Sequence, residues 1–156
     1  MRTRGFTLIE LVITLAIIGL LTTAAMPLAQ LVAKREKEAD LRQALREIRT
    51  AIDAYRESAR GGHIKLELGA SGFPSDLKSL YIGVEDAMSE KKVNLYFLRR
   101  VPRDPFFPDG SVAAEDTWGL RNYQSPPDDP QPGDDVYDVY SHSSVKGLNG
   151  VPYDEW

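Results

Sequence analysis

Glu10 is the ionisable residue whose position is hardest to explain without a partner. It is the only ionisable side chain in an apolar run of 21 residues, 6–26. A carboxylate inside a membrane span costs at least about 2.5 kcal/mol unless it has a partner. No basic residue lies within helical reach of it between Thr7 and Ala33. Glu10 is therefore predicted to pair with a charge on another chain, with extension to the membrane interface as the alternative.

The remaining polar residues give little support to catalysis. The chain has no cysteine, which excludes thiol nucleophiles and disulfides. His63 and His142 lack the spacing of metal ligands on one helix. Ser141 and His142 are adjacent, and neighbours on a strand point to opposite faces, so they cannot act as nucleophile and base. We expect that the chain is not an enzyme, and a signal-anchored periplasmic enzyme remains the least favoured alternative.

The charge is distributed unevenly along the chain. From Asp104 onward there are eleven acidic residues against two basic ones, while residues 34–60 carry eight basic and six acidic residues. An anionic C-terminal part disfavours nucleic acid as a partner, because phosphate binding needs clustered lysine or arginine. No nucleic-acid partner is expected.

Two consecutive helical patterns position these residues. As a helix, residues 6–26 measure about 32 Å, which is enough to cross a bilayer core. After Pro27, which should bend or locally melt the helix, the pattern becomes amphipathic and is predicted to pack on a globular domain up to Gly61. Its apolar stripe is Leu41, Leu45, Ile48, Ile52 and Tyr55. Its basic-leaning face either is solvated or meets an acidic surface of another subunit, and comprises Lys34, Arg35, Arg42, Arg46 and Arg49.

The rest of the chain predicts a small β-structure. Residues 118–123 and 136–141 have the best strand composition, while residues 125–135 (SPPDDPQPGDD) cannot form regular structure. We therefore expect an α+β fold in which the long N-terminal helix packs on an antiparallel sheet of two to four strands. The predicted parts are 1–5, 6–32, 33–60 and 61–156.

The first ten residues, MRTRGFTLIE, have a further meaning. A short basic leader that ends at Gly5, directly before the apolar run, resembles the signal of type IV pilins and type II secretion pseudopilins. The resemblance implies that prepilin peptidase cuts between Gly5 and Phe6 and that the new N-terminus is methylated. Phe6 then carries a free amine that can reach Glu10 of a neighbouring subunit. Pro27 matches a proline common in that superfamily.

The C-terminal part resembles the major (G-type) pseudopilin of type II secretion systems. The similar segments, in conserved order, are residues 97–106, the Trp-Gly pair at 118–119 with Tyr123, and residues 137–141 (YDVYS). Residues 107–116 are an insertion relative to that pattern. That family often binds calcium after the last of these segments, which implies Ser141 and Asp154 as ligands. The loop lacks other carboxylates before Asp154, although calcium prefers six to eight oxygens.

The resemblance implies a structural rather than a chemical role. The residues 1–5 would be the leader, 6–32 the transmembrane and polymerisation helix, 33–60 the amphipathic helix and 61–156 the globular domain. The subunit would lie in the bacterial inner membrane as a single-pass protein with a periplasmic domain and would assemble into a periplasmic pseudopilus. Expected partners are further copies of itself, minor pseudopilins, the inner-membrane secretion platform and prepilin peptidase. A structural subunit of a type IV pilus is the alternative.

Overall fold

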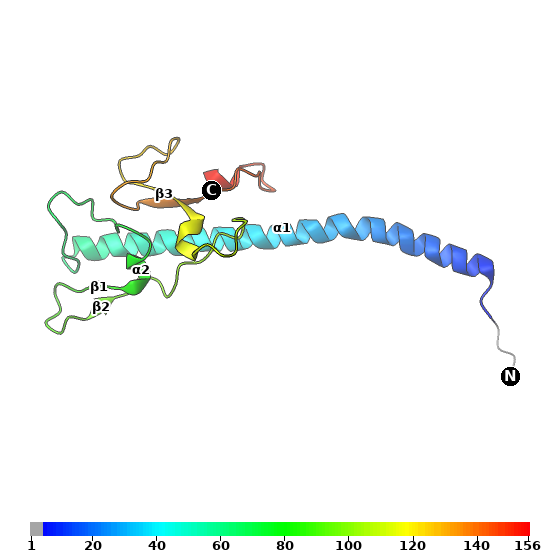
Figure 1. Ribbon diagram of the computed structural model, residues 1–156, viewed down its shortest axis with the longest axis horizontal. Helices are drawn as coiled ribbons and strands as arrows, with labels where there is room; N and C mark the ends of the chain where they lie inside the picture. Colours follow the sequence, from blue (N-terminus) through cyan, green and yellow to red (C-terminus); the bar gives the residue numbers. More distant parts are fainter. Residues whose placement is uncertain (1–4) are drawn as a thin grey trace. The chain divides into compact units, whose positions relative to one another are not determined.

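The computed structural model describes residues 5–156, and the chain divides into two compact units, Met1–Lys37 and Glu38–Trp156. Residues 1–4, which hold most of the predicted leader, lie outside the described residues. The helix α1 (Leu8–Arg60) contributes to both units, and the strands β1 to β4 belong to the second (Figure 1). The predicted α+β class, a long N-terminal helix with small antiparallel sheets, is confirmed.

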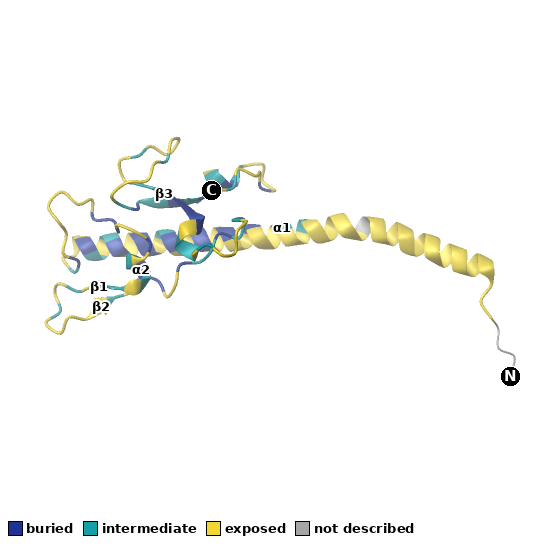
Figure 2. Ribbon diagram, in the orientation of Figure 1, coloured by how far each residue is buried: buried dark blue, intermediate teal, exposed yellow. Residues whose placement is uncertain are grey.

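In the first unit, α1 exposes its apolar side chains. Leu8, Leu15 and Leu20 are 81%, 61% and 72% exposed, and this part of the helix is coloured as exposed in Figure 2. Its length and composition suffice to cross a membrane. Exposed aliphatic side chains in such number are unfavourable in water, so the helix requires an apolar environment or other helices around it.

Pro27 lies inside α1, and the helix continues through it. Local melting at this residue is therefore absent from the single chain, and the expected bend stays a prediction. Pro27 cannot donate a hydrogen bond to the carbonyl of Thr23, but its fixed φ is compatible with a helix. The loss of one hydrogen bond in a helix of 53 residues leaves the other turns intact.

In the second unit, the predicted apolar stripe of α1 forms the core. Leu41, Leu45, Ile48, Ile52 and Tyr55 are 0%, 3%, 0%, 1% and 8% exposed. Steps of three and four residues place these side chains on one face of the helix. Buried residues from the rest of the unit complete the core, among them Leu80, Val136, Val139 and Tyr153.

Glycine ends the helix as the sequence indicates. The Gly62 N–H donates to Ala59 O (3.1 Å), the His63 N–H donates to Ser58 O (3.0 Å), and Gly62 has φ +83°. This pair of bonds around a left-handed residue is a Schellman motif, which glycine adopts without a steric penalty. The chain then turns away from α1 into the loops of the second unit.

Four short strands form two separate sheets. β3 (Trp118–Arg121) pairs with β4 (Asp138–Ser141), and β1 (Val84–Glu85) pairs with β2 (Asn94–Leu95), both antiparallel. Gly119 lies opposite Tyr140, and a Cβ at Gly119 would lie 2.3 Å from the Tyr140 ring. Only glycine therefore fits at this position of β3.

Short helical turns connect the strands. They are α2 (Ser79–Ile82), the 3₁₀ turn η1 (Ala114–Thr117) and the 3₁₀ turn η2 (Tyr153–Glu155). The proline-rich residues 125–135 contain no helix or strand, as the sequence predicted. The irregular chain between these elements is held by side-chain contacts with α1 and with the β3–β4 pair.

Candidate functional site

The first turn of α1 contains Glu10, the candidate assembly residue. The Thr7 N–H donates to Glu10 Oε2 (3.3 Å), and the Glu10 N–H donates to Thr7 Oγ1 (3.3 Å). The Thr7 hydroxyl also lies 3.4 Å from Glu10 Oε2. These reciprocal contacts form a capping box, with Thr7 directly before the first residue of α1. A carboxylate at this end of a helix is further stabilised by the positive end of the helix dipole.

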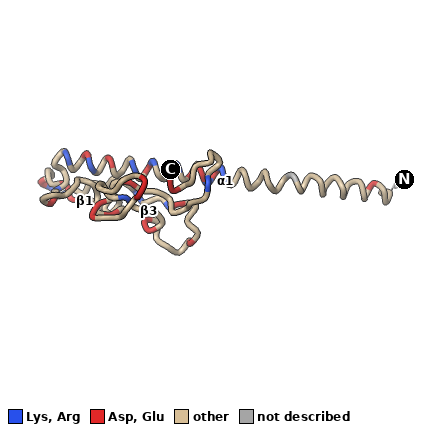
Figure 3. The backbone as a smooth tube through the Cα atoms, turned by 90° about the horizontal axis from the view of Figure 1, so that it is seen from above, with Lys and Arg blue, Asp and Glu red and all other residues tan. Residues whose placement is uncertain are grey.

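The capping box adds a second role for Glu10 that the sequence interpretation missed. The signal was present, because Thr7 and Glu10 have the Ser/Thr-x-x-Glu spacing of a capping box. Within one chain the carboxylate thus has neutral hydrogen-bond donors, although no cation among residues 5–156 is within helical reach. Figure 3 shows that no charged residue follows it along α1 until Lys34. Both Gly5 and Phe6 precede the helix and are exposed, and Phe6 is 86% exposed.

Polar side chains in the apolar part of α1 are satisfied within the helix. The hydroxyls of Thr14, Thr22 and Thr23 donate to backbone carbonyls three or four residues earlier, at 2.8, 2.8 and 2.7 Å. Such bonds remove the penalty for placing a hydroxyl in hydrocarbon, where no water is present. These three hydroxyls are therefore compatible with a lipid environment.

In the second unit, Glu38 holds the C-terminal segment against α1. Its side chain is 3% exposed, and Oε1 accepts hydrogen bonds from the Leu148 N–H (2.7 Å) and the Tyr153 hydroxyl (2.9 Å). Arg42 Nη2 lies 3.6 Å from the other carboxylate oxygen. Burial, and then the hydrogen bond and charge of Glu38, raise the pKa of Tyr153 to about 12. The phenol therefore stays protonated and donates to the carboxylate at neutral pH.

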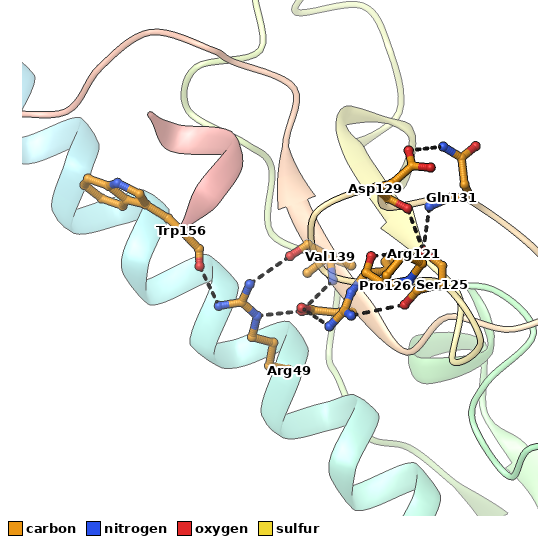
Figure 4. A network of polar contacts seen from close by, with 9 residues as sticks. Arg49, Arg121, Ser125, Pro126, Asp129, Gln131, Val139 and Trp156 are labelled. Atoms are coloured by element: carbon orange, nitrogen blue, oxygen red, sulfur yellow. Dashed lines mark hydrogen bonds and ion pairs between the residues drawn. The ribbon is translucent and has the colours of Figure 1, made fainter. Parts of the chain in front are cut away.

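Arg49 joins three separate parts of the second unit (Figure 4). Its guanidinium donates to Asp138 Oδ1 (2.7 Å), Val139 O (3.1 Å) and Trp156 O (3.0 Å), and Arg121 donates to the other oxygen of Asp138 (3.2 Å). The planar guanidinium suits this arrangement because its donors point in fixed directions. The prediction that Arg49 belongs to a basic face, either solvated or in contact with another subunit, is therefore wrong. The guanidinium makes its contacts within the chain.

Arg42 also differs from the predicted basic face. Its guanidinium lies 4.3 Å from the centroid of the Trp156 ring, besides its contact with Glu38. The side chain of Arg42 is nevertheless 48% exposed, and Arg46 and Arg35 are exposed as well. The part of the predicted face that is available to another subunit is accordingly smaller than the sequence pattern indicated.

Asp104 is a buried carboxylate that the sequence interpretation did not single out. It is 1% exposed, and it accepts hydrogen bonds from the Ser141 hydroxyl (2.6 Å) and the Phe106 N–H (2.8 Å). Its own N–H donates to the hydroxyl of Thr117 (3.1 Å). This network fixes the Asp-Pro loop to the ends of β3 and β4. The proline after Asp104 was a signal for a loop, but not for burial of the carboxylate.

The predicted calcium ligands do not assemble an oxygen-rich site. The hydroxyl of Ser141 is buried and donates to Asp104, while Asp154 is half-buried and its N–H donates to Ser143 O (3.1 Å). Within residues 5–156 no three histidine, cysteine, aspartate or glutamate side chains lie together as a metal site would require. Calcium prefers six to eight oxygens, so these residues do not fit the ion and we derive no role for it.

Comparison with known families bears on the N-terminal segment. Residues 1–26 match the family model described as the prokaryotic N-terminal methylation motif. Searches of curated proteins and of solved structures found no match. The match covers 26 of the 156 residues and supports a type IV pilin-like N-terminal signal, of the kind that prepilin peptidase processes. Together with the apolar part of α1, it is consistent with anchoring in a membrane.

Proposed function

We propose that this protein is a structural subunit of a type II secretion pseudopilus. Prepilin peptidase cuts between Gly5 and Phe6, and residues 6–32 then anchor the subunit and later pack against other copies. The observation that carries the proposal is the methylation motif at residues 1–26, which continues into an apolar helix with exposed side chains and one carboxylate near its start.

The exposed side chains of α1 supply the driving force for both states of the subunit. In the membrane they contact lipid, and in a filament they pack against the same helix of neighbouring subunits. The threonine hydroxyls that bond within the helix, such as those of Thr14 and Thr22, do not need water in either state. One helical segment can therefore serve as membrane anchor and as filament core.

Glu10 is proposed to set the register between subunits. In the single chain its carboxylate accepts hydrogen bonds from neutral groups of Thr7. Cleavage after Gly5 would create an amine on Phe6, and an amine from a neighbouring subunit would add an opposite charge in an apolar environment, where such a pair is strong. Pro27 is proposed to give α1 a place to bend during assembly.

The globular part favours secretion over adhesion. The Trp-Gly pair that begins β3 and the segment at 137–141 that contains β4 are similar to segments of the G-type pseudopilin. Pilus subunits commonly carry a C-terminal disulfide, and this sequence has no cysteine. A structural subunit of a type IV pilus is the second candidate, supported by the same N-terminal motif. Minor pseudopilins, the inner-membrane platform and a periplasmic location of the second unit follow from the proposal.

Co-expression with prepilin peptidase tests the processing step. Mass spectrometry of the wild-type protein should show the loss of residues 1–5 and the gain of one methyl group. The Gly5→Ala variant should keep its full mass, because the peptidase reads the residue before the cleaved bond. A wild-type chain that stays uncut in the presence of an active peptidase would contradict the proposal. A second experiment expresses this protein in cells that lack their own major pseudopilin. Restored export of a secreted protein would support the secretion function over the pilus function.

A further inference from the structure

A tight turn near the C-terminus exposes three aliphatic side chains. In residues 145–151, the C-terminal turn, Gly147 N–H donates to Val151 O (2.8 Å) and Gly150 N–H donates to Gly147 O (3.0 Å). Val145, Leu148 and Val151 are 59%, 45% and 37% exposed. Single exposed aliphatic residues are common on protein surfaces, but three on one turn of seven residues form a local apolar surface.

The C-terminal turn is held at a defined point of α1. The Leu148 N–H donates to the buried carboxylate of Glu38, and Tyr153, which follows the turn, donates to the same carboxylate oxygen. Tyr153 N–H also donates to Val145 O (3.2 Å), which closes the base of the turn. The bond from Leu148 is made by its backbone N–H, so a substitution of the side chain leaves this hydrogen bond in place.

Chain length limits how far the C-terminal turn can lie from the bilayer. Glu38 is the sixth residue after Val32, which ends the proposed transmembrane segment 6–32. Six residues of helix extend about 9 Å, and even a fully extended chain of six residues spans no more than about 22 Å. The polar headgroup region on each side of the hydrocarbon core is about 5 to 7 Å thick. Because α1 continues as a helix through residue 38, the attachment point lies about 9 Å beyond the end of the proposed span, close to the headgroup region.

The charges near this point suit a phospholipid surface. Residues 34–37 are Lys, Arg, Glu and Lys, and Lys146 lies on the C-terminal turn itself. A net positive charge beside a membrane favours contact with anionic headgroups. The negative charge of Glu38 is covered by the turn, with a side chain only 3% exposed, so it does not face the phosphates.

We propose that Val145, Leu148 and Val151 insert into the boundary between headgroups and acyl chains of the bilayer that holds the chain's own N-terminal helix. The inference rests on the membrane anchoring in the proposed function. The contact is a second, weaker attachment that holds the globular unit on the membrane surface. It breaks when the subunit leaves the bilayer for a filament, so it sets part of the barrier to assembly.

Spin labels on single cysteines test the contact, because the natural chain has no thiol. The full chain is reconstituted in nanodiscs of phosphatidylethanolamine and phosphatidylglycerol, with one label at Val145, Leu148 or Val151. Oxygen concentrates in acyl chains and a nickel chelate stays in water, so labels in the turn should collide more with oxygen and less with nickel. A label at Leu68, which is fully exposed on a distant loop, serves as the aqueous reference, and a label at Ile17 reports insertion of the span.

A substitution tests the energetics of the same contact. The label at Val145 reports the ratio of chains whose C-terminal turn is in the bilayer to chains whose turn is in water. Leu148→Asn in this labelled chain should lower that ratio about fivefold, since about half of one leucine side chain leaves the apolar phase. Leu68→Asn, in the same labelled chain, should leave the ratio unchanged. Turn labels that match position 68 while Ile17 reads lipid would overturn this inference alone. An aqueous signal at Ile17 would overturn the membrane anchoring as well. Turn labels that are protected from nickel only in lipid-free filaments would overturn the lipid contact and assign the surface to a second copy of the chain.

Discussion

Removal of the Glu38 carboxylate should destabilise the second unit by about 2–4 kcal/mol. A hydrogen bond to a charged group contributes about 1.5–3 kcal/mol, and Glu38 accepts two such bonds besides its contact with Arg42. In Glu38→Ala the Tyr153 hydroxyl, whose residue is 0% exposed, loses its acceptor, while water can reach the N–H of the more exposed Leu148. Glu38→Gln keeps an oxygen in place and should cost about 1 kcal/mol.

Denaturant unfolding of the full chain in detergent, followed by circular dichroism, measures these differences in free energy. Thermal unfolding of the same variants gives the corresponding shifts in Tm. For a unit of this size, 1 kcal/mol corresponds to a shift of about 4 °C in Tm, so Glu38→Ala should lower Tm by about 8–16 °C. Glu47→Ala is the matched control, since Glu47 is exposed on the same helix and its loss should change stability by less than about 0.5 kcal/mol.

A double-mutant cycle identifies the partner. Combining Glu38→Ala with Tyr153→Phe should reveal a coupling energy of about 1 kcal/mol between the two residues, because each single change already removes their shared hydrogen bond. A coupling below about 0.3 kcal/mol, or an Glu38→Ala variant as stable as the Glu47→Ala control, would refute the view that Glu38 anchors the C-terminal segment.

The other contacts make further predictions. Arg49→Lys should lower the free energy of unfolding by about 1–2 kcal/mol, because an ammonium cannot reach Asp138, Val139 and Trp156 together. Chemical denaturation measures this change, and the control Arg46→Lys should leave the free energy of unfolding unchanged. The pKa of Tyr153 is raised above its unfolded value, so its stabilising contribution should be complete below about pH 10 and decline as pH rises toward 12; ultraviolet titration should show one late tyrosine that disappears in Tyr153→Phe. Glu10→Val should insert normally but form far fewer filaments by electron microscopy, and normal filament numbers would remove the proposed pairing. Calcium should leave Tm of the full chain unchanged relative to a chelator, because side chains and backbone groups of the chain already hold the C-terminal segment; a clear rise in Tm would restore the ion.

Local pattern made much of the first half of the chain predictable. The stripe from Leu41 to Tyr55 and the helix end at Gly62 depend on residues within a few positions of one another, where the 3.6-residue period and the conformational freedom of glycine decide the outcome. The capping box of Thr7 and Glu10 was equally local, and its spacing could have been recognised. The melting expected at Pro27 is not seen, because a fixed φ compatible with a helix and a missing hydrogen bond act in opposite directions, and the sequence does not say which dominates.

The polar contacts of the second unit depended on the fold. Glu38 and Leu148 are 110 residues apart in sequence, and Arg49 and Asp138 are 89 apart. On a helical wheel both Glu38 and Arg49 look like ordinary surface charges, because their positions border the apolar stripe. Only when the C-terminal segment crosses α1 does one carboxylate become buried and one guanidinium become a junction.

The sequence by itself determined that this protein has a methylation-type N-terminus, an apolar helix with one carboxylate and an amphipathic continuation. Each of these features depends only on residues that are close together in the sequence. The tertiary structure decided which charges serve the fold and which remain at the surface. The physical reason is that burial and hydrogen-bond geometry depend on distant segments meeting, and residue type alone does not specify that meeting.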